Sequence, residues 1–208
     1  MNHAIGVGVL DDQMAAIRDL NRNIKFRKAI QHGIDGKAFA KAMSKGPFVS
    51  VYAGGIARDS AFFDPDATSF FQYNPAGANA LLDGLGLMDS DGNGVRNFAN
   101  GGGDLVINLV TNKDSENEKL IGDGLATMMA EIGIKVNLKP MEDRKPLDQS
   151  GEWDWAVTRA QQEYAFPNSG YWSELGPVTN STFVPHLGTA ENPQQLQPFE
   201  KEIVKILE

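Results

Sequence analysis

The sequence has no cysteine, few histidines and more acidic than basic side chains. Its 208 residues include 19 lysines and arginines, 27 aspartates and glutamates and 3 histidines, so the formal net charge is −8. The absence of cysteine excludes a disulfide framework and a zinc site with thiolate ligands. The acidic balance argues against nucleic acid as a partner, because contacts to phosphates need a surface rich in lysine and arginine.

Long apolar runs are missing too. The uncharged stretch from Ala67 to Leu82 contains Thr68, Asn74 and other polar side chains, so it is too polar for the core of a bilayer. The first residues, MNHAIGVGVLDDQ, do not combine a basic start with a continuous apolar segment and do not resemble a secretory signal. With 41% apolar and 22% charged residues, the composition is that of a globular chain. We expect no membrane-spanning segment.

Sequence signatures of catalysis and of cofactors are scarce. The chain lacks a thiol and a GxSxG motif, and its histidines are His3, His32 and His186. The GLG sequence at residues 84–86 continues into Leu87 rather than toward a third glycine, so it is not a dinucleotide-binding loop. We therefore expect no cofactor. Nucleophilic catalysis has little support in the sequence, and an enzyme that uses a Ser-Lys or a carboxylate pair stays open, although no spacing indicates one.

The middle of the chain predicts a strand, a helix and a second strand. Leu105–Thr111 is an apolar run, and Lys113–Ile132 carries apolar residues at helical spacing. Ile134–Leu138 alternates apolar and polar residues before Pro140, which is expected to end the strand. Two strands joined by a helix run parallel in one sheet. A third strand is predicted over Trp153–Arg159.

Further helices are predicted on both sides of this unit. They cover about Asp11–Leu20, Ile24–Met43, Pro75–Leu82 and Gln195–Leu207. The second of these is weakened at its centre, so it is either one helix or two, with Asp35 capping the second. The expected fold class is α/β, with a mixed, largely parallel sheet, a βαβ unit and flanking helices. All 208 residues are expected to form a single lobe.

An acidic segment, DSDGNG at residues 89–94, has two interpretations. Asp89, Asp91 and Asn93 alternate as the first ligands of a calcium loop do, but Asn100 stands where a bidentate glutamate belongs. The favoured interpretation is a tight turn whose side chains bond to their own backbone. A calcium-stabilised structural module built on these three residues is the alternative.

A polar and aromatic cluster follows the third predicted strand. In open α/β sheets, ligands bind beyond the carboxyl ends of the strands. A guanidinium, two amides, a carboxylate and two rings can orient a small polar ligand there. Internal pairing of the charges with packing of the rings fits the cluster equally well, and a hydrolase using Glu163 and Asp154 is a further alternative. The candidate ligand-binding residues are Arg159, Gln161, Gln162, Glu163, Tyr171 and Trp172.

Five segments resemble, in order, motifs of the family 5 extracellular solute-binding proteins, the peptide- and oligopeptide-binding type that serves ABC importers. Each motif is short, but their common order makes the resemblance specific. The segments are FRKAIQHGID at 26–35, YNP and ALL between 73 and 82, DSDGNGVR at 89–96, IGIKV at 132–136 and GEWD at 151–154.

The resemblance implies a protein of two lobes that closes on its ligand by a hinge. The chain corresponds to the second, α/β lobe, so we expect it to be a fragment of a longer protein. That protein is expected to carry a signal, to act in the periplasm or as a lipoprotein on the outer face of the membrane, and to deliver its solute to an ABC permease.

The resemblance also bears on the ligand. Peptide binders of the family carry a W-x-x-D-Y-x-x-P loop whose aspartate holds the ligand's amino group. Here Glu163 stands at the aspartate position, Tyr164 and Pro167 match, and Ala160 replaces the tryptophan. The expected ligand is therefore a small polar solute, either a peptide or another type such as an opine or a sugar phosphate.

Overall fold

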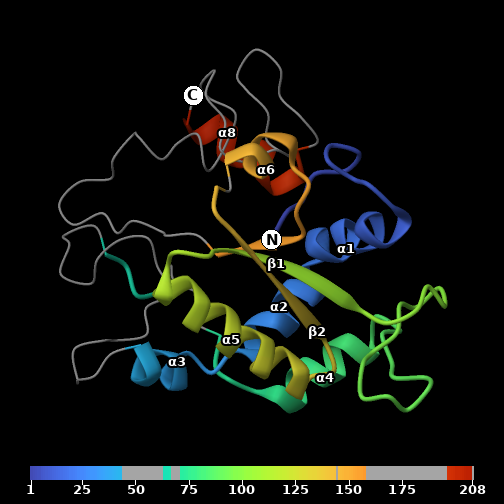
Figure 1. The fold of residues 1–208 in the computed structure, drawn as a ribbon. Helices are drawn as coiled ribbons and strands as arrows, with labels where there is room; N and C mark the ends of the chain where they lie inside the picture. The colour runs from blue at the N-terminus through green and yellow to red at the C-terminus, as the bar shows by residue number, and fades with distance from the viewer. Residues whose placement is uncertain (44–62, 67–70, 144, 158–195, 208) are drawn as a thin grey trace.

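A small parallel sheet organises the chain in the computed structural model (Figure 1). It consists of β1 (Val106–Asn112), β2 (Lys135–Met141) and β3 (Trp155–Ala156) in the order β2-β1-β3. Both neighbours run parallel to β1, with Val106 opposite Lys135 and Leu109 opposite Trp155. The predicted α/β class with a parallel βαβ unit is confirmed. The structure describes residues 1–43, 63–66, 71–143, 145–157 and 196–207.

Two strand ends differ from the prediction. Strand β2 continues through Pro140 to Met141. A proline is tolerated there because β2 is an edge strand of the sheet that the described residues form, and its missing N–H is not needed by a neighbour. Strand β3 is only two residues long and starts at Trp155 rather than Trp153.

Helix α5 (Glu116–Glu131) connects β1 to β2 and contacts both strands. It begins three residues later than predicted, because the Ser115 hydroxyl accepts a hydrogen bond from the Glu118 N–H and caps the helix. It ends before Gly133, whose φ of +76° is the left-handed conformation that glycine adopts after a helix. The helix therefore brings β2 back alongside β1.

Among the described residues, four helices precede the sheet in sequence. They are α1 (Asp12–Arg22), α2 (Ile24–Gly33), α3 (Gly36–Met43) and α4 (Pro75–Asp83). The predicted segment 24–43 is thus two helices, and the Asp35 carboxylate caps the second by accepting from the N–H groups of Lys37 and Ala38. Helices α2 and α4 pack against each other.

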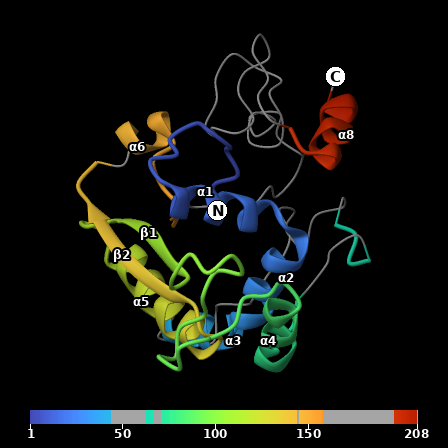
Figure 2. The same ribbon diagram turned by 90° about the vertical axis from the view of Figure 1, so that its right-hand side faces the viewer.

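The last helices are α6 (Lys145–Ser150) and α8 (Pro198–Leu207). Figure 2 shows α8 on the side of the molecule away from β2. Helix α6 has no counterpart among the predicted elements, because six residues are too few to show a helical period. On the predicted apolar side of α8, Phe199 is 47% exposed, and the Arg27 guanidinium lies 5.9 Å from its ring centroid.

One hydrophobic core joins the sheet to the helices on both sides. Strand β1 lies at its centre, since Ile107 and Leu109 are almost fully buried. Residues from α1, α2, α4 and α5 complete the core, so the helices are held in fixed positions around the sheet. The main contributors are Ile17, Phe26, Ile30, Leu82, Met129, Ile132 and Ile134.

Candidate functional site

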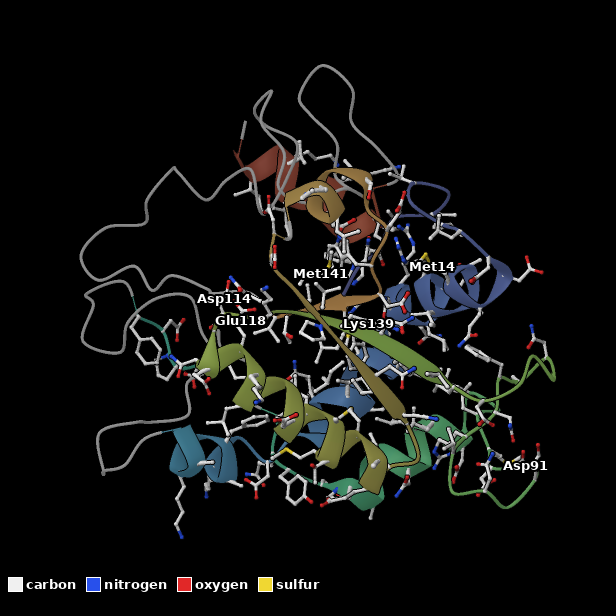
Figure 3. The ribbon with its side chains drawn as sticks, in the orientation of Figure 1. Met14, Asp91, Asp114, Glu118, Lys139 and Met141 are labelled. Carbon is white, nitrogen blue, oxygen red and sulfur yellow. The ribbon has the colours of Figure 1, made fainter. Side chains whose placement is uncertain are left out.

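The carboxyl ends of β1 and β2 are tied together by the residues that follow them. The Lys113 N–H donates to the carbonyl oxygen of Met141 at 2.9 Å, and the Lys113 ammonium pairs with the Glu142 carboxylate. The Asn112 N–H donates to the Glu118 carboxylate at 2.7 Å. Figure 3 shows Glu118 at the start of α5, near Met141 at the end of β2. These contacts form one polar edge at the carboxyl ends of both strands.

Strand β3 leaves the sheet at the same edge. The Val157 N–H donates to the carbonyl oxygen of Val110 at 3.1 Å, one residue beyond the end of β3. The polar and aromatic cluster predicted to bind the ligand starts two residues later in the sequence. Its members, Arg159, Gln161, Gln162, Glu163, Tyr171 and Trp172, lie outside the described residues, so their assignment to the site stays a prediction.

Asp154 lies immediately before β3 and is buried, with only 1% of its surface exposed. Its Oδ2 atom accepts hydrogen bonds from the backbone N–H of Asn108 at 3.0 Å and from its Nδ2 at 3.1 Å. Burial raises the pKa of Asp154, although the bonds from Asn108 and the charge of Arg18 lower it. Enclosed beside β1, this carboxylate does not have the access to substrate that the hydrolase interpretation needs.

Asp154 binds to Asn108 on β1, and a second set of buried polar side chains binds to the backbone of residues 151–155. Arg18 Nη2 donates to the carbonyl oxygens of Gly151 at 2.7 Å and of Trp153 at 3.0 Å. Asn2 Nδ2 donates to the same two oxygens at 2.9 and 3.1 Å. We call this set, with Asn21, Asn108, Asp154 and Trp155, the Arg18–Asp154 network.

The rest of the network links α1 to β3. The indole N–H of Trp155 donates to Asn21 Oδ1 at 2.9 Å, and Asn21 Nδ2 donates to the Asn2 carbonyl oxygen at 2.8 Å. The charge of Arg18 is buried, and burial lowers the pKa of its guanidinium, while Asp154 raises it. Sequence reasoning missed the network. The only local signal is Arg18 and Asn21 beside the core residue Ile17 on α1.

The DSDGNG segment forms the tight turn that the sequence favours. The Asp89 carboxylate accepts hydrogen bonds from the N–H groups of Gly92 at 2.8 Å, Asn93 at 3.1 Å and Gly94 at 2.9 Å. These bonds lower the pKa of Asp89, with Gly94 contributing most. The Asn93 amide bonds to Asp91 and to Asp104. Figure 3 shows Asp91 at the far side of the molecule from Asp114, which follows β1.

The described residues contain neither a metal-binding cluster nor a membrane-spanning helix. Within them, no group of three or more histidine, cysteine, aspartate or glutamate side chains is arranged to hold a metal ion. Among the helices in the same ranges, none has the length and apolar character needed to cross a bilayer.

Residues 2–182 match the bacterial extracellular solute-binding proteins, family 5, over the middle part of that family. The chain belongs to this family. A periplasmic α-galactoside-binding protein of Rhizobium meliloti (strain 1021) is 32% identical over 207 residues, which are 97% of this chain and 30% of the relative. This chain thus spans less than a third of the length of the α-galactoside-binding protein.

Solved structures of solute-binding proteins share the fold. The periplasmic binding protein MelB of Agrobacterium fabrum C58, in complex with stachyose, is 32% identical and has a TM-score of 0.85. The match covers all of this chain and 32% of MelB. The oligopeptide-binding protein OppA has a TM-score of 0.74 over 98% of this chain and 34% of its own, and its 18% identity shows a common fold alone. These relatives are binding proteins, and the α-galactoside-binding protein and MelB are periplasmic.

Proposed function

We propose that this chain is one lobe of the solute-binding component of an ABC importer, and that its solute is an α-galactoside oligosaccharide. The observation that carries the proposal is the 32% identity, along nearly the whole chain, to an α-galactoside-binding protein and to a protein solved with stachyose. The oligopeptide-binding protein reaches only 18%. Of the solute types expected from the sequence, a neutral saccharide thus has more support than a peptide, an opine or a sugar phosphate.

The binding wall is proposed at the carboxyl edge of the sheet, in the residues that follow Val157. Amide, guanidinium and carboxylate groups offer both donors and acceptors to sugar hydroxyls. Aromatic rings offer flat apolar faces to the C–H faces of a sugar. The proposed contacts are Arg159, Gln161, Gln162, Glu163, Tyr171 and Trp172. The chain spans about a third of the length of these two relatives. We therefore assign the opposite wall of the cleft to the remainder of the full-length protein.

The proposed setting follows from the relatives named as periplasmic. The full-length protein is expected in the periplasm, or attached as a lipoprotein to the outer face of the inner membrane, where it passes its solute to an ABC permease. Mass spectrometry of the mature full-length protein tests the attachment directly, because a lipid anchor adds a defined mass to the N-terminal peptide.

Titration calorimetry of the full-length protein tests the solute and the site together. Stachyose, a tripeptide, an opine and a sugar phosphate are titrated separately, and heat of binding is expected with stachyose. Arg159→Ala and Glu163→Ala are expected to weaken binding, while Asp123→Ala, at an exposed position on α5, serves as the matched control. Unchanged affinity in the first two variants would remove them from the site. Binding of the tripeptide without stachyose would overturn the proposed solute.

A further inference from the structure

Strand β3 is the shortest strand of the sheet, yet it positions the chain just before the proposed contact residues. Only two of its residues pair with β1, Trp155 with Leu109 and Ala156 with Val110. A strand of two residues has few backbone hydrogen bonds to fix its direction. Its attachment therefore depends on the side chains that hold residues 151–155.

Asp154 extends the attachment of β3 at its amino end. In a continued parallel ladder, the Asn108 N–H would donate to a backbone carbonyl of the neighbouring strand. Here it donates to Asp154 Oδ2 instead, at 3.0 Å, and the Asn108 side-chain amide donates to the same oxygen. The Trp153 carbonyl is bonded instead by Asn2 and Arg18. The carboxylate thus replaces a backbone acceptor in the ladder.

The charges of the Arg18–Asp154 network are not arranged for maximal stability. Burial is the largest influence on both partners, since it raises the pKa of Asp154 and lowers that of Arg18 despite their mutual attraction. Asp154 Oδ1 and Arg18 Nε are buried and have no hydrogen-bond partner among the residues that the structure describes. A buried pair of this kind is a poor source of stability, and its best-attested use is to specify one arrangement over others.

We propose that Asp154 is a positioning residue, which fixes β3 on β1 and thereby sets the direction in which the chain enters the solute-binding edge. Arg18 and Asn2 support it by holding the carbonyl groups of Gly151 and Trp153. The inference rests on the proposed solute-binding function, because it assigns a role to residues that precede the proposed contacts in the sequence. The hydrogen-bond acceptor at Asp154 matters for this role, and its charge does not.

Two substitutions separate the acceptor from the charge. Asp154→Ala removes the oxygen that accepts from Asn108, whereas Asp154→Asn keeps a side-chain oxygen for both bonds. Both variants leave Arg18 without its counter-charge, so both are expected to melt at lower temperature than the wild type. Asp123→Ala, at an exposed position on α5, is the matched control.

The first readout is the affinity of the full-length variants for stachyose at a temperature where all are folded. Asp154→Ala is expected to bind about ten-fold more weakly, and Asp154→Asn within about two-fold of the wild type. A purely structural role would lower the melting temperature and leave both affinities unchanged, which would overturn the inference. An equal loss of affinity in both variants would overturn the assignment to the acceptor. Should Asp154→Ala not fold, Asn108→Ala removes one of the two bonds and is expected to weaken binding about three-fold.

The second readout needs no ligand. The Val157 amide, bonded to the Val110 carbonyl, is expected to exchange with solvent at least about ten-fold faster in Asp154→Ala than in the wild type, with α5 amides unchanged. An unchanged Val157 rate would overturn the positioning role. If the wild-type protein does not bind stachyose, only the proposed solute is overturned. The exchange rate of the Val157 amide still decides whether Asp154 positions β3.

Discussion

Two polar regions of the molecule both contain aspartate and asparagine side chains, but they differ in how far apart in the sequence the hydrogen-bonded residues lie. In the turn of residues 89–94, Asp89 bonds to amides three to five positions away, and Asn93 reaches Asp104, eleven away. In the Arg18–Asp154 network, Arg18 reaches Gly151 across 133 positions and Asn2 reaches Trp153 across 151. The first region is exposed and the second buried. The turn therefore stabilises its own local conformation, whereas the network holds distant parts of the fold together.

The largest effect is expected when the buried cation of the Arg18–Asp154 network is removed. Arg18→Met is expected to lower the free energy of unfolding by about 3 kcal/mol, because it leaves the buried Asp154 carboxylate without its counter-charge and the Ala4 carbonyl without its donor. Urea unfolding measures the change, with Lys119→Met on the exposed side of α5 as the control. A loss below about 1 kcal/mol would show that the network is no more important to stability than a surface contact.

Gly133, which follows helix α5, lies against the buried side chain of Arg96. Gly133 has a φ of +76°, and a Cβ there would lie 2.9 Å from Arg96 Cγ, whose guanidinium bonds the Ile132 carbonyl at 2.8 Å. Gly133→Ala is expected to cost about 2 kcal/mol, from backbone strain together with the displacement of Arg96.

Gly92→Ala is the matched control for that variant. Gly92 has the same φ of +76° with nothing within 4 Å of an added Cβ, so it reports the strain alone. Its expected cost is about 1 kcal/mol in the same unfolding experiment. Equal losses in the two variants would show that the contact with Arg96 contributes nothing.

Asp89→Ala is expected to have a smaller effect, because the Asp89 carboxylate is exposed and bonds only within its turn. Its pKa is lowered from the ordinary value of 3.8 by the turn amides, so the ionised form is the one stabilised on folding. The stability that Asp89 contributes is therefore present above pH 3.8 and is lost as the pH falls through the lowered pKa. Melting curves of both proteins between pH 2 and 7 should converge at the acidic end; a constant difference would contradict this origin.

The smallest expected effect is that of calcium. Each of Asp89, Asp91 and Asn93 already has side-chain oxygens bonded within the turn. A turn closed by its own amides does not need a cation to hold its shape. We expect the melting temperature to be the same in calcium and in chelator, and a rise of several degrees with calcium would instead support the structural-module interpretation.

The parts of the fold that could be predicted are those whose signals are local. The run of β1, the helical spacing of α5 and the alternation of Ile134, Val136 and Leu138 identify the βαβ unit without knowledge of any distant contact. The Asp35 and Asp89 side chains likewise act on backbone amides within a few positions. Each of these elements is confirmed to within a few residues.

The parts that could not be predicted depend on distant partners. Strand β3 is shorter than its sequence pattern indicates, because the Asp154 carboxylate takes the place of a backbone carbonyl opposite Asn108. Nothing near Arg18 in the sequence indicates that it bonds to Gly151. For the candidate site, the sequence predicts the edge of the sheet at which β3 ends, whereas the contacts of Arg159 and Glu163 stay predictions.

A competition measured by native mass spectrometry tests the proposed function most directly. The full-length protein is mixed with equimolar stachyose, a tripeptide, an opine and a sugar phosphate, and the bound species is identified from the mass of the complex. A protein built to bind α-galactosides should give one complex, heavier than the free protein by the mass of stachyose. A complex carrying the tripeptide, the opine or the sugar phosphate in its place would contradict the proposed function.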